Sequence, residues 1–425
     1  MANPLDISLS ALALLIFAAG GLLLAEVADH TPPKVEIVGG GANVEGDVSL
    51  GPVRGRGVWE LKTYDARPGV HAVRVRVDGG KPIKMKSIGE FGIDTALLQD
   101  GPHTFSVEVV DRSIRRNATV VSGTFVSDNT PPDLAVAQTS LVGQQGRTLQ
   151  IWLRSNEVLD GFRGAFLKKE RTLHALDGGV ENGGGKLFRA LVGVPVDTKA
   201  GRSPMELRAR DLAGNVRRVF LAVEITPGKF ARGGMIRLTK EQELARGQTE
   251  RIRATNLARN EAYATPIAEQ LWTDPFIKPV RGRRTSPFGK YRTYSDGKKK
   301  HHFGVDLANR TGTPVFAAAD GKVVLAEEQQ IYGNVVIVHH GQGVATSYNH
   351  LHAAAVGVGD AVARGTKIGT VGSTGQSTGP HLHWGMTVDG TAVDAEQWVG
   401  RDFMDPGDDA VWIPVKEIEL KKKSS

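Results

Sequence analysis

Histidine and aspartate side chains gather in one part of the chain. Eight of its 12 histidines lie between residues 301 and 383, in stretches that read HFGVD from residue 302, YNHLH from residue 348 and HLHWG from residue 381. Side chains two apart on a strand share a face, so His381 and His383 can point into one cleft. An even separation of four does the same for His302 and Asp306. Two imidazoles and one carboxylate suit zinc, because a catalytic zinc needs only three protein ligands and keeps a fourth position for water.

With His302, Asp306 and His383 as the metal ligands, His350 and His381 remain unassigned. Zinc activates a water for attack on an amide, but the reaction also requires proton transfer and stabilisation of the developing oxyanion. Two histidines that do not bind the metal can supply both. The residue types therefore predict a hydrolytic zinc site.

Four other histidines compete for these roles. His339 and His340 end an apolar strand-like run, NVVIVHHG, and are expected to be structural or surface residues. His301 and His352 each adjoin a proposed site residue. Spacing alone does not fix which imidazole reaches the metal, so either one can replace its neighbour in the site.

Several further motifs stand in a fixed order around these histidines. They are TSPFG from residue 285, GTPVFA from residue 312, DGKV from residue 320, YGN from residue 332 and GSTGQSTGPHLHWG from residue 372. Together with HFGVD and SYNHL, they make residues 284–398 resemble the lysostaphin and LytM type of zinc endopeptidase. One departure is Asp394-Ala395, where many relatives have Asp-Pro, and it lies outside the proposed zinc ligands.

The resemblance carries implications for both the site and the fold. It implies that His302, Asp306 and His383 bind zinc, while His350 and His381 act on the water and the transition state. It also implies a compact antiparallel β-sheet, and runs such as GKVVLAEE and NVVIVHH between glycine-containing turns agree with that fold.

Length and composition set limits on the rest of the chain. A chain of 425 residues is too long for one core, so we expect three or four folded units. With 52 Gly and 20 Pro, the composition favours a mainly β protein rich in turns. The chain contains no cysteine, so disulfides are excluded and any metal site must use histidines and carboxylates.

The N-terminus contains an uncharged apolar run, ISLSALALLIFAAGGLLLA, over residues 7–25. Its length approaches the ~20 residues that cross a bilayer as a helix. A basic region before the run and a small-residue cleavage site after it, typical of a cleaved signal peptide, are both missing. We therefore expect residues 1–28 to form a transmembrane helix or an uncleaved signal that anchors an exported protein in the cytoplasmic membrane.

A tandem repeat follows the apolar run. Asp29-His30-Thr31-Pro32-Pro33 recurs as Asp128-Asn129-Thr130-Pro131-Pro132, an offset of 99, and the far ends repeat at Asp111 and Asp211, an offset of 100. Matching offsets indicate two similar domains, and alternating apolar residues between glycine-rich breaks indicate strands. The D-x-T-P-P openings resemble bacterial immunoglobulin-like repeats. We predict two immunoglobulin-like β-sandwiches at 29–127 and 128–226, acting either as spacers or as surfaces for wall polymer or envelope proteins.

A basic segment connects the repeats to the histidine-rich region. Residues 229–300 contain 17 Lys plus Arg against 7 Asp plus Glu, an excess of 10 positive charges. Leu244, Ile252 and Leu257 give a weak helical pattern, so we expect a basic helical linker at 227–280, a peptidase domain at 281–400 and a tail at 401–425. The charge can attract an anionic wall polymer or belong to an ordinary solvated loop. Nucleic-acid binding is not expected, because no recognition module is present.

These observations predict a zinc metalloendopeptidase of the cell envelope that cleaves the peptide cross-links of peptidoglycan. One alternative is a non-catalytic regulator that activates other wall hydrolases. Such domains have lost zinc ligands, whereas this sequence keeps all of the proposed ones. The other alternative is a peptidase of secreted proteins.

Overall fold

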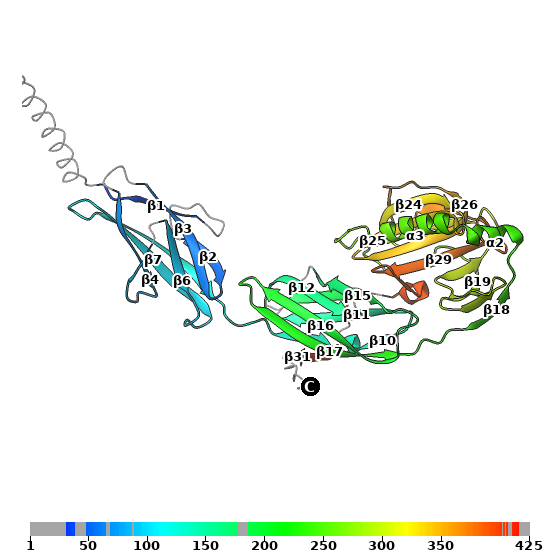
Figure 1. The fold of residues 1–425 in the computed structure, drawn as a ribbon, viewed down its shortest axis with the longest axis horizontal. Helices are drawn as coiled ribbons and strands as arrows, with labels where there is room; N and C mark the ends of the chain where they lie inside the picture. Colours follow the sequence, from blue (N-terminus) through cyan, green and yellow to red (C-terminus); the bar gives the residue numbers. More distant parts are fainter. Residues whose placement is uncertain are drawn as a thin grey trace, which may run out of the picture. The chain divides into compact units, whose positions relative to one another are not determined.

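The protein is described from a computed structural model that covers residues 31–38, 48–64, 69–86, 89–167, 169–176, 186–401, 403, 405–406 and 410–415. Strands dominate the described residues, so the expected mainly β class is confirmed (Figure 1). The chain forms two compact units. One extends to Pro132 and includes Arg210–Val216, and the other comprises Asp133–Ala209 and the residues from Arg217 onward.

The first unit contains two sheets that share one core. One sheet has the order β1 (Lys34–Val38), β3 (Arg56–Tyr64), β6 (Glu90–Asp94). The other has the order β2 (Val48–Val53), β8 (Ala118–Ser127), β7 (Gly101–Asp111), β4 (Val70–Val77), β5 (Ile83–Lys84). Strand β7 shows how the sequence builds them, because Phe105, Val107 and Val109 alternate with polar residues and are buried. They pack with Trp59 and Phe91 of the opposite sheet.

Two further sheets follow and repeat this arrangement. One has the order β10 (Val142–Gln144), β17 (Val216–Thr226), β16 (Gly201–Asp211), β12 (Leu159–Phe166), β13 (Lys169–Thr172). The other has the order β14 (His174–Ala175), β15 (Lys186–Gly193), β11 (Thr148–Ser155), β9 (Leu134–Ala137), β31 (Trp412–Val415), and a 3₁₀ turn, Gln138–Leu141, follows β9. In both copies a short strand pairs in parallel with the second arm of a long hairpin. The matched topology agrees with the sequence repeat, and the immunoglobulin-like assignment stays a prediction.

The predicted C-terminal tail, residues 401–425, contains a strand. Strand β31 pairs antiparallel with β9 and so becomes the edge of a sheet that begins almost three hundred residues earlier. Phe403, just before it, is buried and stacks on Trp398 with ring centroids 3.9 Å apart. This pairing could not be predicted from the sequence, because WIPV is too short to identify a partner strand.

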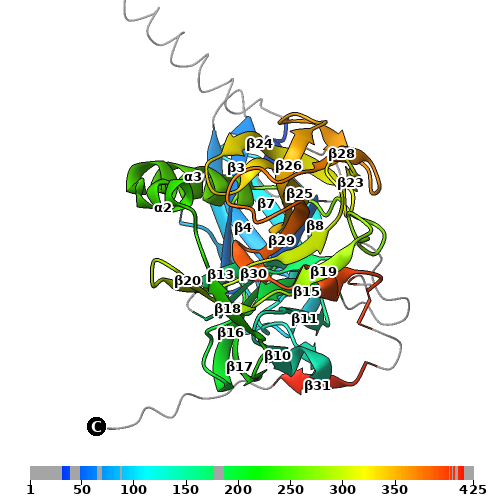
Figure 2. The same ribbon diagram turned by 90° about the vertical axis from the view of Figure 1, so that its right-hand side faces the viewer.

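The histidine-rich region forms a large antiparallel sheet. Its strands run in the order β19 (Arg283–Ser286), β22 (Val305–Ala308), β29 (His381–Val388), β26 (Val344–Ala354), β25 (Gly333–Gly341), β24 (Gly321–Gln329), β27 (Ala361–Val362). Three more strands attach to it, β23 (Pro314–Phe316), β28 (Lys367–Val371) and β30 (Thr391–Val393), and a 3₁₀ turn, Ala395–Trp398, follows. Figure 2 shows β28 beside β26, and β23 pairs with β28. Strand β25 is buried almost throughout, as expected for a strand covered on both faces.

The expected helical linker is a strand followed by two helices. Strand β18 (Arg232–Ile236) joins β20 (Tyr291–Tyr294) and β21 (Lys299–His301) in a small sheet. Helices α2 (Lys240–Gly247) and α3 (Thr249–Tyr263) come next in the chain. Among the described residues, no helix has the length and apolar character needed to cross a membrane. The predicted N-terminal anchor lies outside the described residues.

Candidate metal centre

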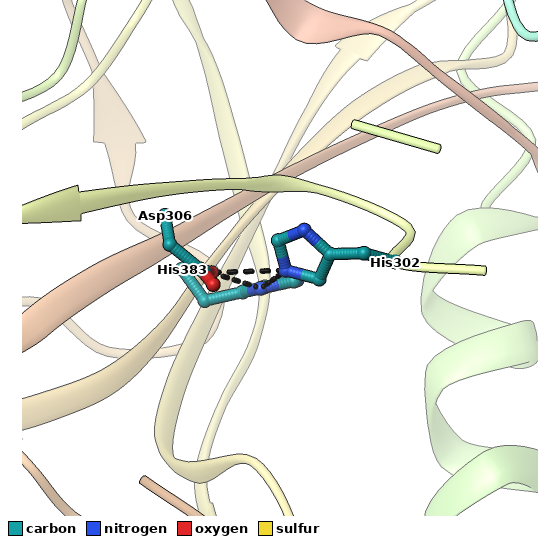
Figure 3. A group of neighbouring side chains, drawn as sticks. All are labelled: His302, Asp306 and His383. Atoms are coloured by element: carbon teal, nitrogen blue, oxygen red, sulfur yellow. Dashed lines mark hydrogen bonds and ion pairs between the residues drawn. The ribbon is translucent and has the colours of Figure 1, made fainter. Parts of the chain in front are cut away.

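The three predicted metal ligands meet at one point (Figure 3). Nε2 of His302 lies 2.9 Å from Nδ1 of His383, and Oδ1 of Asp306 lies 2.9 Å from each of these nitrogens. All three ligand atoms are therefore close enough to share a single ion. Tetrahedral ligand atoms at about 2.0–2.1 Å from zinc are about 3.3 Å from one another. The three ligand atoms would therefore have to move apart only slightly to hold zinc. The donor set fits this metal.

The elements that position the ligands differ in part from the sequence expectation. Asp306 lies on β22 and pairs in register with His383 of β29, so neighbouring strands bring these two together. The proposal that His302 and Asp306 share the face of one strand was wrong. His302 follows the end of β21, and a turn through Gly304 separates it from β22. A β-carbon at Gly304 would lie 2.5 Å from Nε2 of His383, so this position needs glycine.

Contacts behind the ligands hold them in place. Nδ1 of His302 faces the Pro287 carbonyl at 3.1 Å, and a proton there leaves Nε2 free to bind a metal. The guanidinium of Arg292 donates to Oδ2 of Asp306 at 2.6 Å and to the Ser286 hydroxyl at 2.8 Å. One carboxylate oxygen is therefore held by arginine while the other faces the histidines. Sequence reasoning missed Arg292, because it lies in a run of basic residues interpreted as a surface.

The two histidines proposed to act on the substrate flank the ligands. Nδ1 of His350 lies 2.8 Å from the Thr374 carbonyl, and Nδ1 of His381 lies 2.7 Å from the Gly379 carbonyl. Their rings are 4.9 Å apart, and Nε2 of His381 is 3.8 Å from Oδ1 of Asp306. His381 and His383 share strand β29, as their spacing predicted. Each flanking imidazole is thus anchored through one nitrogen.

Burial controls the charges in this cluster. Burial, together with the neighbouring His383 and His381, lowers the pKa of His350 to about 3. Burial also lowers the pKa of His383 to about 4. Burial acts to raise the pKa of Asp306, but hydrogen bonds from His302 and His383 outweigh it and bring that pKa below its usual value. A carboxylate beside neutral imidazoles is the protonation state that binds a divalent cation.

The other histidines lie elsewhere. The ring of His301 contacts the Gly289 carbonyl and packs against Tyr291, and His352 is exposed. His339 and His340 are fully buried on β25. The structural reading of this last pair is confirmed, and the surface reading is wrong.

Comparison with known proteins gives matches over the histidine-rich region. The model of peptidase family M23 matches residues 300–395. The chain is 44% identical over 94 residues to the peptidoglycan DD-endopeptidase ShyA of Vibrio cholerae, covering 22% of each chain. It is 36% identical to the catalytic domain of lysostaphin from Staphylococcus simulans, over 27% of this chain and 90% of that one, with a TM-score of 0.25.

A relative of another kind also matches. The chain is 30% identical over 220 residues to the murein hydrolase activator EnvC of Escherichia coli, covering half of each chain. The matches therefore span about a fifth to a half of the curated relatives. Residues 300–395 are similar to peptidases of family M23.

Proposed function

We propose that this chain is a zinc endopeptidase that hydrolyses the peptide cross-links of peptidoglycan. The observation that carries the proposal is the meeting of His302, Asp306 and His383 beside two histidines that are each anchored through Nδ1. The name of the related DD-endopeptidase supports the substrate. The basic segment before the domain suits a wall polymer that carries negative charge.

The roles follow from which nitrogen each histidine leaves available. His302, Asp306 and His383 would hold the zinc, which would supply Lewis-acid chemistry to a water and to the scissile carbonyl. His350 donates its Nδ1 proton to the Thr374 carbonyl, so Nε2 is the basic nitrogen and can accept a proton from the attacking water. The lowered pKa of His350 keeps that nitrogen unprotonated at neutral pH before the reaction. His381 is also anchored through Nδ1 to a carbonyl, so its Nε2 must first take up a proton before it can donate to the developing oxyanion or the departing amine.

The wider arrangement belongs to the same proposal. The N-terminal apolar run would anchor the chain in the cytoplasmic membrane, with the folded domains exported into the cell envelope. The two sandwiches would hold the peptidase domain at a distance from the membrane, or bind wall polymer or other envelope proteins.

An activator without its own hydrolysis is the second candidate, and the similarity to EnvC favours it. The complete group of metal-binding side chains argues for the enzyme instead. One experiment separates them: purified full-length protein is incubated with purified peptidoglycan after zinc loading, after chelation and after zinc is restored. Products are identified by mass spectrometry, which also names the bond cleaved.

The enzyme proposal expects uncross-linked peptides that appear with zinc, vanish with chelator and return with zinc. Products that appear only when a second wall hydrolase is added would support the activator. Zinc-loaded protein that releases no peptides with or without the second wall hydrolase, yet cleaves a secreted protein, would support a peptidase of secreted proteins.

A further inference from the structure

Helix α3 lies against the peptidase sheet although it precedes the region that matches the family. Ala258 and Ala262 of this helix pack with Leu325 of β24 and with Val335 and Ile337 of β25. Figure 1 shows the helix along these two strands. The linker helix therefore contributes to the core of the catalytic domain.

One charged side chain is buried in this contact. Arg259 of α3 is only 8% exposed, and Nη1 donates to Oδ1 of Asn349 at 3.0 Å and to Oε1 of Gln329 at 3.3 Å. Nη2 donates to the Tyr263 hydroxyl at 2.6 Å, and the guanidinium lies over the Tyr332 ring, 4.1 Å from its centroid. These four partners are all neutral. Burying a cation without a paired carboxylate costs free energy. The contacts of Arg259 are not ion pairs, so their role lies in the residues that they hold in place.

The first line of contact leads to a metal ligand. Asn349 is fully buried, and its Nδ2 donates to the backbone carbonyl of His383 at 3.1 Å. Asn349 and His383 are also register partners between β26 and β29. Because Arg259 can only donate, it fixes the oxygen of the Asn349 amide toward the helix and the nitrogen toward His383.

The second line of contact leads to a histidine proposed to act on the water. The backbone N–H of His350 donates to the Tyr332 carbonyl at 2.8 Å. His350 has a φ of 60°, a backbone conformation that residues other than glycine adopt only at a cost in free energy. The Tyr332 segment that restrains this backbone lies under the guanidinium of Arg259.

We infer that Arg259 is a positioning residue for the metal centre, acting on His383 through Asn349 and on His350 through Tyr332. It touches neither metal nor substrate. The inference rests on the proposed zinc site and assigns the linker helix to the catalytic machinery. Arginine is required rather than lysine, because one planar group must donate in two directions while stacking on a ring.

The test uses full-length protein with Arg259→Met, Arg259→Lys and a matched control, Arg253→Met. Arg253 lies on the same helix, is 72% exposed and pairs with Glu250 at the surface. Zinc affinity is measured by competition with a chelator, and kcat and KM are measured on cross-linked peptidoglycan peptides. Outer contacts of metal ligands typically contribute 10–100-fold to affinity or activity. We expect a loss of that size in zinc affinity and kcat for both Arg259 variants, with KM and Arg253→Met near wild type.

Several results would overturn the inference. They are wild-type zinc affinity and kcat in Arg259→Met, a lowered melting temperature as its only change, or full recovery in Arg259→Lys. If Arg259→Met does not fold, Asn349→Ala removes the link to His383 and carries the same expectation. Wild-type protein that binds zinc without cleaving peptidoglycan would contradict the proposed function. The affinity measurement would still decide the role of Arg259.

Discussion

His340 and His350 lie on neighbouring strands of the peptidase sheet and differ in how their ring nitrogens are used. On β25, Nδ1 of His340 contacts the Asp320 carbonyl and Nε2 contacts the Thr346 hydroxyl, so both nitrogens have partners from the protein. On β26, Nδ1 of His350 is held by a carbonyl, while Nε2 makes no hydrogen bond to any residue that the structure describes. His339 on β25 also has a ring nitrogen without a partner among the described residues, since only its Nδ1 is held, by the Gly341 N–H, so a free nitrogen marks the site only where it lies beside the metal ligands.

The largest effect is expected from removing a ligand. His383→Ala takes away one of three metal-binding atoms, so zinc content should fall far below one per chain and hydrolysis by about 10³-fold or more. Elemental analysis and peptidoglycan digestion measure both. His352→Ala is the matched control, because His352 is an exposed histidine on β26. Equal losses in the two variants would show that zinc binding and hydrolysis do not depend on His383 in particular.

A smaller effect is expected from the arginine behind the carboxylate. Arg292→Met frees Oδ2 of Asp306, so we expect zinc affinity to weaken by about 10–100-fold while the fold persists. Chelator competition measures the affinity, and Arg283→Met, which alters an exposed arginine on β19, is the control. An unchanged zinc affinity in Arg292→Met would mean that the hydrogen bond from Arg292 does not help Asp306 to bind the metal.

The smallest effect concerns stability and the histidines of β25. Burial lowers the pKa of His340 to about 4, below its usual value near 6.5. The unfolded chain therefore binds more protons between these values, and stability falls as pH decreases through this range. Between pH 7 and pH 5 this histidine should account for a loss of about 2 kcal/mol, which His340→Gln should remove.

This comparison is made by denaturant unfolding of both proteins after chelation, so that metal release does not contribute. The free energy of unfolding of the variant at pH 7 need not equal that of wild type, because the test compares how this free energy changes with pH in the two proteins. Parallel slopes in the two proteins would show that His340 does not stay neutral in the folded state.

The sequence predicted those parts of the site that depend on local spacing. His381 and His383 are two residues apart on β29 and so lie in the same region. The alternating apolar and polar residues of β7 likewise predict a strand with one buried face. The position of His302 was explained wrongly, because a turn rather than a shared strand face brings it to Asp306. A shared strand face and a turn can each bring His302 close to Asp306. The predicted ligands therefore lie together in the structure, although the predicted strand does not include His302.

Contacts between distant segments could not be predicted in this way. Arg292 and Arg259 both belong to the basic segment, where charge alone suggested solvent exposure. The structure places Arg292 on the carboxylate of Asp306 and buries Arg259 of α3 against the sheet. Likewise, nothing in Trp412–Val415 indicates that it pairs with Leu134–Ala137. Such pairings depend on the whole fold and not on local periodicity.

The proposed site divides residues that hold the metal from residues that act on the substrate. His350→Ala tests that division when zinc content and peptidoglycan hydrolysis are measured on the same preparation. We predict about one zinc per chain, as in wild type, with hydrolysis reduced by about 10²–10⁴-fold. Loss of zinc together with activity, or hydrolysis at the wild-type rate, would contradict the proposed role of His350.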